Sequence, residues 1–167
     1  MSSMSRRELR EHIFKLLFLS EFSDEAAMPE QLALYFDGLV ELHRDDQEYM
    51  EKKYALVQEM LPEIDKMLNE ASEGWKTSRM SKVDLAILRL GVFEMKYDED
   101  IPVKVAINEA VELAKAFGSD NSSKFINGVL GTAYRNIQGE EQTQHAEPKE
   151  SDPATQSTTE ASSGSDE

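Results

Sequence analysis

Hydrophobic residues recur along this chain at the three- and four-residue spacing of an α-helix, and no long segment alternates with the two-residue period of a strand. The pattern predicts an all-α fold of about seven helices. The clearest amphipathic stretch lies within residues 100–131, where Pro102 suits a first helical turn and Gly118 suits a left-handed residue that ends the helix. Its apolar face is formed by Val103, Ala106, Ile107, Ala110, Val111, Ala114 and Phe117.

Two serines mark expected helix starts. Ser5 is followed three residues later by Glu8, and Ser81 by Asp84, which is the capping-box spacing that satisfies the free N–H groups of a first turn. We therefore expect helices to begin at these serines. The other expected starts are Pro29, the pair Asp45 and Asp46, and Pro62, where the pattern either breaks or opens a further helix.

The segment 83–97 is apolar almost all round, which is typical of a helix buried on every side. We expect it to be the central helix, with Gly91 marking a close helix crossing. Asn127 and Gly128 form a hairpin signal, but the residues around them keep helical spacing, so a last helix is predicted to run through them. These elements predict two small packed helical bundles, residues 1–60 and 61–137.

Composition changes abruptly after residue 137. Residues 138–167 contain no large hydrophobic residue and carry eight acidic residues against one lysine, so we predict a disordered acidic tail. The tail accounts for −7 of the net charge of −15, and residues 1–137 account for −8. An acidic balance disfavours a polyanionic partner, although binding of nucleic acid depends on a local basic patch.

Several classes of function are disfavoured. The chain has no cysteine, which excludes disulfides and thiolate metal sites. The apolar run 13–19 is interrupted by Lys15, so no membrane span is predicted and we expect a cytoplasmic protein. No glycine-rich phosphate loop or nucleophile motif occurs. We therefore predict no catalytic residues, no cofactor and no metal, and expect that the protein is not an enzyme.

The most suggestive chemistry lies at the start of the first expected helix. Arg6 and Arg10 are four residues apart on one helix face with Arg7 beside them, which is suitable for following a phosphate backbone. Phe18 or Phe125 is a candidate for stacking on an unpaired base. From the residues alone, the alternative is a solvated first turn and two phenylalanines of the core.

For three residues in or near the central helix, the sequence allows either a structural or a binding role. Trp75, just before this helix, is more often a core residue between bundles than a base-stacking residue. Asp84 and Arg89 either form structural hydrogen bonds or bind a protein partner. The residue pattern does not separate these two roles.

Several segments together resemble the NusB family of transcription antitermination factors. They are VDLAILRL at 83–90, IPVKVAINEAVELAK at 101–115, the pair Phe117 and Gly118, and KFINGVL at 124–130. The basic start of the first helix extends the resemblance over about residues 5–137, while residues 23–76 match only as a helical pattern.

The resemblance implies a small all-α RNA-binding protein that pairs with the ribosomal protein NusE on boxA-type single-stranded RNA. It would act within the transcription elongation complex, notably on ribosomal RNA operons. The RNA surface of the family corresponds here to Arg6, Arg7, Arg10, Phe18, Asn121, Ser122, Lys124 and Phe125. Two alternatives stay open: a detached NusB-like module of a ribosomal RNA methyltransferase, or a helical adaptor or homodimer that binds no RNA.

Overall fold

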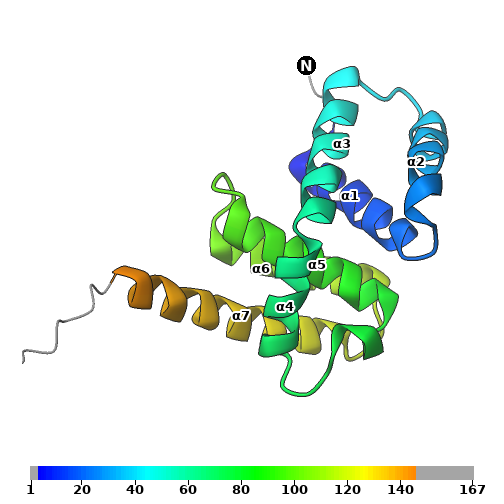
Figure 1. Ribbon diagram of the computed structural model, residues 1–167. Helices are drawn as coiled ribbons and strands as arrows, with labels where there is room; N and C mark the ends of the chain where they lie inside the picture. Colours follow the sequence, from blue (N-terminus) through cyan, green and yellow to red (C-terminus); the bar gives the residue numbers. More distant parts are fainter. Residues whose placement is uncertain (1–3, 146–167) are drawn as a thin grey trace, which may run out of the picture.

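The computed structural model describes residues 4–145 of the chain, and within these residues every regular element is helical (Figure 1). The all-α prediction is confirmed, including the final helix through Asn127 and Gly128. The elements are α1 Arg6–Ser20, the 3₁₀ turn η1 Glu25–Ala27, α2 Met28–Asp37, α3 Arg44–Glu59, α4 Leu61–Ala71, the 3₁₀ turn η2 Thr77–Arg79, α5 Lys82–Tyr97, α6 Val103–Phe117 and α7 Ser122–His145.

Serine caps set the starts of α1 and α5, as expected. The backbone N–H of Glu8 donates to Ser5 Oγ at 3.1 Å, and the Ser5 N–H donates back to Glu8 Oε2 at 3.4 Å. At α5, the Asp84 N–H donates to Ser81 Oγ at 3.1 Å. Each cap satisfies donors that have no partner within the helix, and so fixes the residue at which the helix begins.

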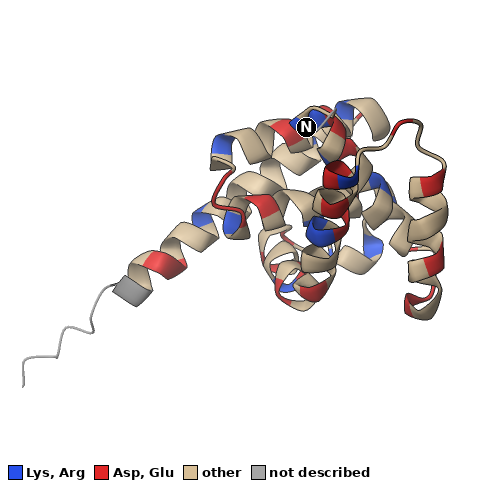
Figure 2. Cartoon of the chain, turned by 90° about the horizontal axis from the view of Figure 1, so that it is seen from above, with Lys and Arg blue, Asp and Glu red and all other residues tan. Residues whose placement is uncertain are grey.

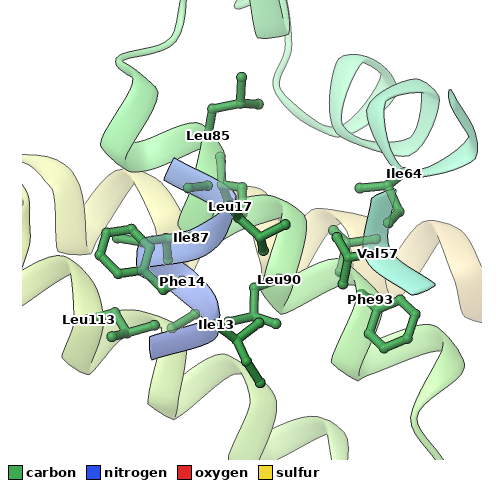
Figure 3. Close-up of a cluster of buried hydrophobic side chains, with 14 of the residues drawn as sticks. Ile13, Phe14, Leu17, Val57, Ile64, Leu85, Ile87, Leu90, Phe93 and Leu113 are labelled. Atoms are coloured by element: carbon green, nitrogen blue, oxygen red, sulfur yellow. The ribbon is translucent and has the colours of Figure 1, made fainter. Parts of the chain in front are cut away.

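Helix α5 is the centre of the fold. Every residue from 85 to 95 is buried, and α1, α4, α6 and α7 all pack against this helix. Figure 3 shows Ile13, Phe14 and Leu17 of α1 in one cluster with Ile87 and Leu90 of α5. Burial of large apolar side chains on all sides contributes far more to stability than the helix propensity of any single residue, which explains why so hydrophobic a helix lies inside.

Gly91 marks the close crossing that the sequence predicted. A Cβ placed on this residue would lie 3.0 Å from Leu130 Cδ1 of α7 and 3.5 Å from Ala110 Cβ of α6. The absence of a side chain therefore lets α5 approach both neighbouring helices closely. This contact explains why the glycine is placed in a helix despite its low helix propensity.

The remaining helices surround α5 in two groups. Helix α1 packs against α3 and α5, while α4 packs against α5 and α7. Helix α2 lies at the edge of the molecule, beside η1, and stands apart from α3 (Figure 1). The chain passes from α3 to α4 at Met60, where we expected one bundle to end, yet the buried hydrophobic residues of both groups form one continuous core.

The last helix is longer than the sequence suggested. Helix α7 continues to His145, eight residues beyond the expected boundary at residue 137, because extending an existing helix through polar residues costs little once its first turns are packed. The rest of the predicted disordered tail, 146–167, lies outside the described residues. No helix of residues 4–145 is both long enough and apolar enough to cross a membrane.

Candidate nucleic-acid interface

The exposed start of α1 contains two of the three predicted RNA-binding arginines. Arg6 is exposed and forms no ion pair with any of residues 4–145. The side chain of Arg7 is 71% exposed, but its guanidinium donates to both carboxylate oxygens of Glu109 on α6, at 3.1 and 2.9 Å. The hydrogen bond from Arg7 lowers the pKa of Glu109, so this carboxylate is ionised and holds the arginine in place.

Arg10 is buried, and the prediction that it shares an exposed face with Arg6 is wrong. Only 7% of the residue is exposed, and its Nε and Nη2 donate to Glu94 of α5 at 2.8 and 2.9 Å. The first turn of α1 is open to solvent, whereas the second turn lies over α5. Burial alone would lower the pKa of Arg10, but the hydrogen bonds and charge of Glu94 outweigh it, and the pKa is raised.

A buried ionic network surrounds this arginine. We call Arg10, Lys53, Glu94, Asp98 and Glu109 the Glu94 cluster. Lys53 Nζ of α3 lies 3.0 Å from Glu94 Oε2 and 3.2 Å from Asp98 Oδ2, while Arg10 Nη1 lies 3.6 Å from Glu109 Oε2. The cluster joins α1, α3, α5 and α6, and thereby fixes how the first turn of α1 projects from the fold.

The second part of the predicted surface is the turn between α6 and α7. Gly118 does not have the expected left-handed conformation, because its φ of −90° and ψ of −173° are extended. The glycine is required for a close approach: a Cβ there would lie 2.5 Å from both Cβ and Oγ of Ser122, and 2.8 Å from the carbonyl oxygen of Ala114. Sterics therefore explain the glycine at this position.

Residues of this turn differ in their access to a ligand. Ser122 is only 2% exposed, and its Oγ accepts a hydrogen bond from the Ser119 N–H at 2.9 Å, so the structure assigns it to the turn itself and not to an RNA contact. Asn121 and Lys124 are exposed, and Phe125 is half-buried. Three of the four predicted residues of the turn are thus accessible.

Phe18 is half-buried in a row of rings that leads from the buried Phe14 to the exposed Phe22, just beyond the end of α1. Its ring centroid lies 6.4 Å from that of Phe14 and 5.0 Å from that of Phe22, which packs edge-on. Phe22 is 61% exposed and was missed by the sequence reasoning. The four-residue spacing of the three phenylalanines was the signal that could have found it.

Helices α1 and α6 bring the two predicted regions onto one side of the fold. Arg7 contacts Glu109, and about two turns further along each helix the rings of Phe14 and Phe117 lie 5.2 Å apart, so the two helices run in the same direction. From Glu109 to Gly118 the helix rises about 14 Å. The arginines and the α6–α7 turn therefore lie along a single pair of helices, about that distance apart.

A hollow of about 340 Å³ opens beside this turn, between it and the loop that precedes α5. We call it the Trp75 hollow. Asn121 and Phe125 line one side, while Trp75, Arg79 and Asp84 line the other. Trp75 is 57% exposed, so the expectation that it belongs to the core is wrong. The hydrophobicity of tryptophan predicts burial, whereas the loop turns this side chain outward.

Arg89 and Asp84 have separate surroundings, although both were candidates for partner binding. Arg89 is buried, donates to both carboxylate oxygens of Asp65 at 2.9 and 2.8 Å, and also contacts Glu21. Its role is therefore structural. Asp84 is half-buried at the edge of the Trp75 hollow, and its Oδ1 is buried without a hydrogen-bond donor among residues 4–145.

The surface charge is mixed. Figure 2 shows basic and acidic residues interspersed along the helices in the view from above. Two of the arginines that looked available for an external anion, Arg7 and Arg10, are matched by carboxylates of the protein itself. The cations that remain accessible beside the predicted surface are consequently few.

Comparison with known proteins gives consistent matches over most of the chain. A family model described as the NusB family matches residues 7–135. The transcription antitermination protein NusB of Lachnoclostridium phytofermentans is 50% identical over 127 residues, which cover 76% of this chain and 96% of that protein. The protein of the same name from Listeria monocytogenes is 41% identical over 127 residues, covering 76% and 94%.

Solved structures agree with the fold. NusB of T. maritima superposes with a TM-score of 0.71 at 32% identity, covering 86% of this chain and 99% of that chain. A chain from a structure of the antitermination factors NusB and NusE in complex with dsRNA superposes with a TM-score of 0.66, covering 78% and 96%. Its identity of 22% supports the fold alone.

Proposed function

Because the chain belongs to the NusB family, we propose that this protein is a transcription antitermination factor that binds boxA-type single-stranded RNA together with the ribosomal protein NusE. We place its action in the transcription elongation complex, on ribosomal RNA operons. As a NusB-family transcription factor, the protein is not an enzyme.

The observation that carries this proposal is the joint placement of two accessible regions along α1 and α6. At one end, Arg6 offers an exposed guanidinium that has no ion-pair partner within residues 4–145, and at the other end Lys124 offers an exposed ammonium beside Phe125. An aromatic ring stacks on a base only where that base is unpaired, so this combination suits single-stranded RNA better than a duplex.

The small number of accessible cations supports a role for a second protein. Each phosphate contact with single-stranded RNA contributes about −0.7 to the slope of log K against log salt, so two or three contacts give a slope of only about −1.4 to −2. Residues 1–137 also carry a net charge of −8, which repels RNA. A basic partner that holds the same RNA would raise the affinity by making the second contact intramolecular.

The partner is tested by measuring the dissociation constant of a fluorescently labelled single-stranded boxA-type RNA with and without purified NusE. We expect NusE to tighten binding at least tenfold, because both proteins then share one RNA. A control RNA of scrambled sequence measures the non-specific part of the affinity. If NusE leaves the dissociation constant unchanged, the shared site is wrong.

The basic residues are tested by their salt dependence. In the double variant Arg6→Gln, Lys124→Gln we expect the salt slope of RNA binding to become shallower by about 1.4, because two phosphate contacts are lost. The matched control is Lys66→Gln, which removes an exposed lysine of α4, and its slope should equal that of the unmodified protein. Equal slopes in all three proteins would contradict the assignment.

A further inference from the structure

We propose that the outer side of α2 binds a basic amphipathic helix of a partner protein, at a surface separate from the RNA site. We call the exposed residues Glu30, Ala33, Leu34 and Asp37 the α2 face. A lysine or arginine of the partner would pair with each acid, and apolar side chains of the partner would cover Ala33 and Leu34. This interaction goes beyond the proposed function, since it requires neither RNA nor NusE.

The inner side of α2 fixes the helix and leaves the α2 face open to solvent. The members of the face occupy positions i, i+3, i+4 and i+7 of a ten-residue helix, so they share one side of it. On the opposite side, Met28 and Phe36 are 7% and 4% exposed and belong to the core. The hydroxyl of Tyr35 also lies 2.6 Å from His12 Nδ1 of α1. A partner on the α2 face therefore needs to displace none of these contacts.

Apolar side chains at this edge of the molecule reach into solvent. Leu34 is 60% exposed, and Val40, in the loop that follows α2, is 87% exposed. Six residues of chain separate the two, so they lie at most about 20 Å apart. Single exposed hydrophobic residues are common on protein surfaces, and these two become informative through the charges that surround them.

The charge around the α2 face is of one sign. Residues 16–43 contain six acidic residues and no lysine or arginine. Glu21 is paired with Arg89, whereas the other five are exposed and form no ion pair with residues 4–145: Asp24, Glu25, Glu30, Asp37 and Glu41. In Figure 2, α2 at the right edge carries acidic residues and no basic residue, while both signs occur on each of the other α-helices. Such an edge attracts a cationic partner.

This charge pattern disfavours the other occupants of the α2 face. RNA and the acidic residues 138–167 of this chain are both anionic, so the face repels them. A second copy of the α2 face would bring like charges together, which weakens binding. A basic amphipathic helix has neither problem. Glu30 and Asp37 are two helical turns apart, about 10.5 Å, and cations at the same spacing on a partner helix would meet both.

The α2 face lies away from the proposed RNA surface. On α1, Arg7 and Phe14 contact α6, whereas His12 contacts α2. At about 100° per residue, His12 lies about 140–160° around the helix axis from Arg7 and Phe14. Helices α2 and α6 therefore pack on nearly opposite sides of α1, and a partner on α2 leaves the RNA surface accessible.

A designed peptide tests the chemistry of the surface. We would titrate the full-length protein with a fluorescein-labelled peptide of about four helical turns, in which leucine forms one stripe and lysine covers the rest. One control peptide has the same residues in scrambled order. We expect tighter binding of the amphipathic peptide, with the largest amide NMR shifts in residues 28–41. Equal binding of the scrambled peptide, or largest shifts elsewhere in the chain, would overturn the proposal.

Neutral variants test the acids of the α2 face. The double variant Glu30→Gln, Asp37→Asn should weaken peptide binding about 2- to 30-fold at low salt, because two exposed ion pairs are lost. The matched control is Glu63→Gln, Glu70→Gln, which removes two exposed acids at the same seven-residue spacing on α4. Residues 138–167 are identical in both proteins, so their acidic charge contributes equally. Equal affinities of the two double variants would contradict the proposal.

Leu34→Ala tests the apolar contact and should weaken peptide binding about 3- to 10-fold, because less apolar surface is buried. Its control is Leu56→Ala on α3, at a leucine that is 39% exposed, which should leave the affinity unchanged. Circular dichroism checks that both variants keep their helical content. If Leu34→Ala binds the peptide as tightly as Leu56→Ala, the α2 face is not the site.

Competition separates this inference from the proposed function. The peptide should bind equally well when boxA-type RNA and NusE are present, since the proposed RNA surface lies on the other side of α1. If NusE displaces the peptide, the α2 face belongs to the NusE interface and the separate partner is wrong. If Leu34→Ala converts a dimer into a monomer in sedimentation, the face binds a second copy and the inference is again wrong. Absence of RNA binding with the peptide still bound overturns the proposed function alone.

Discussion

Replacing Glu94 with alanine is expected to lower the free energy of unfolding by about 3–5 kcal/mol, the range observed when one partner of a buried ion pair is removed. Glu94 is 1% exposed, and its carboxylate is the shared acceptor for Arg10 and Lys53, which are 7% and 6% exposed. Without it, the two buried cations keep longer contacts to carboxylates, Lys53 to Asp98 at 3.2 Å and Arg10 to Glu109 at 3.6 Å, and Lys53 keeps a hydrogen bond to Tyr49 at 3.4 Å. Urea unfolding followed by circular dichroism measures the change.

A surface ion pair provides the control for this prediction. Glu112 and Lys115 on α6 form an exposed pair at 3.5 Å with side chains 51% and 61% exposed, so Glu112→Ala should change stability by less than about 1 kcal/mol. A Glu94→Ala protein as stable as Glu112→Ala would show that the Glu94 cluster does not hold the helices together. The same reasoning predicts that Arg10→Ala unfolds more easily than Arg6→Ala.

Replacing Gly118 with alanine is expected to cost about 1–3 kcal/mol and to weaken RNA binding together with stability. The new methyl group would overlap Ser122 at 2.5 Å and press on the carbonyl oxygen of Ala114 at 2.8 Å, so the turn must move. That movement displaces Lys124 and Phe125, which lie in the first turn of α7. Urea unfolding and RNA anisotropy on the same protein measure the two effects.

Gly128 is the matched control for this change, because a Cβ there meets nothing within 4 Å and the residue is an exposed position of α7. Gly128→Ala should stabilise the protein by up to about 1 kcal/mol through helix propensity. In the Gly118→Ala background, Ser122→Gly removes the two closest atoms and should restore part of the lost stability. If Gly118→Ala is as stable as Gly128→Ala, the close approach does not exist.

Local patterns in the sequence predicted most of the fold. The caps at Ser5 and Ser81, the buried helix α5 and the close crossing at Gly91 all follow from interactions within one helix or from a continuous apolar run. Such features depend on the order of residues over a few turns, which periodicity describes well. The end of α7 was missed because polar residues mark both a solvated helix and a chain without structure.

The candidate site was predicted less accurately, because access to a ligand depends on residues distant in sequence. Arg6 and Arg10 have the same spacing signal, yet only Arg10 meets a carboxylate 84 residues away on α5. Ser122 looks like a surface serine until Gly118 lets it close its own turn. Trp75 shows the reverse error, since a loop with two positive φ values exposes a residue that hydrophobicity alone would bury.

The ion pair between Arg7 and Glu109 has a further consequence for selectivity. Glu109 competes with any external anion for Arg7. An incoming phosphate can bind Arg7 only by displacing the Glu109 carboxylate, which accepts hydrogen bonds from Arg7 at 2.9 and 3.1 Å. A polyanion that fits loosely gains little net binding free energy, because it replaces one ion pair of Arg7 with another of similar strength. The surface therefore favours an RNA whose shape places a phosphate at Arg7 while other parts of the protein hold its bases. A ligand that offers only negative charge should bind this surface weakly.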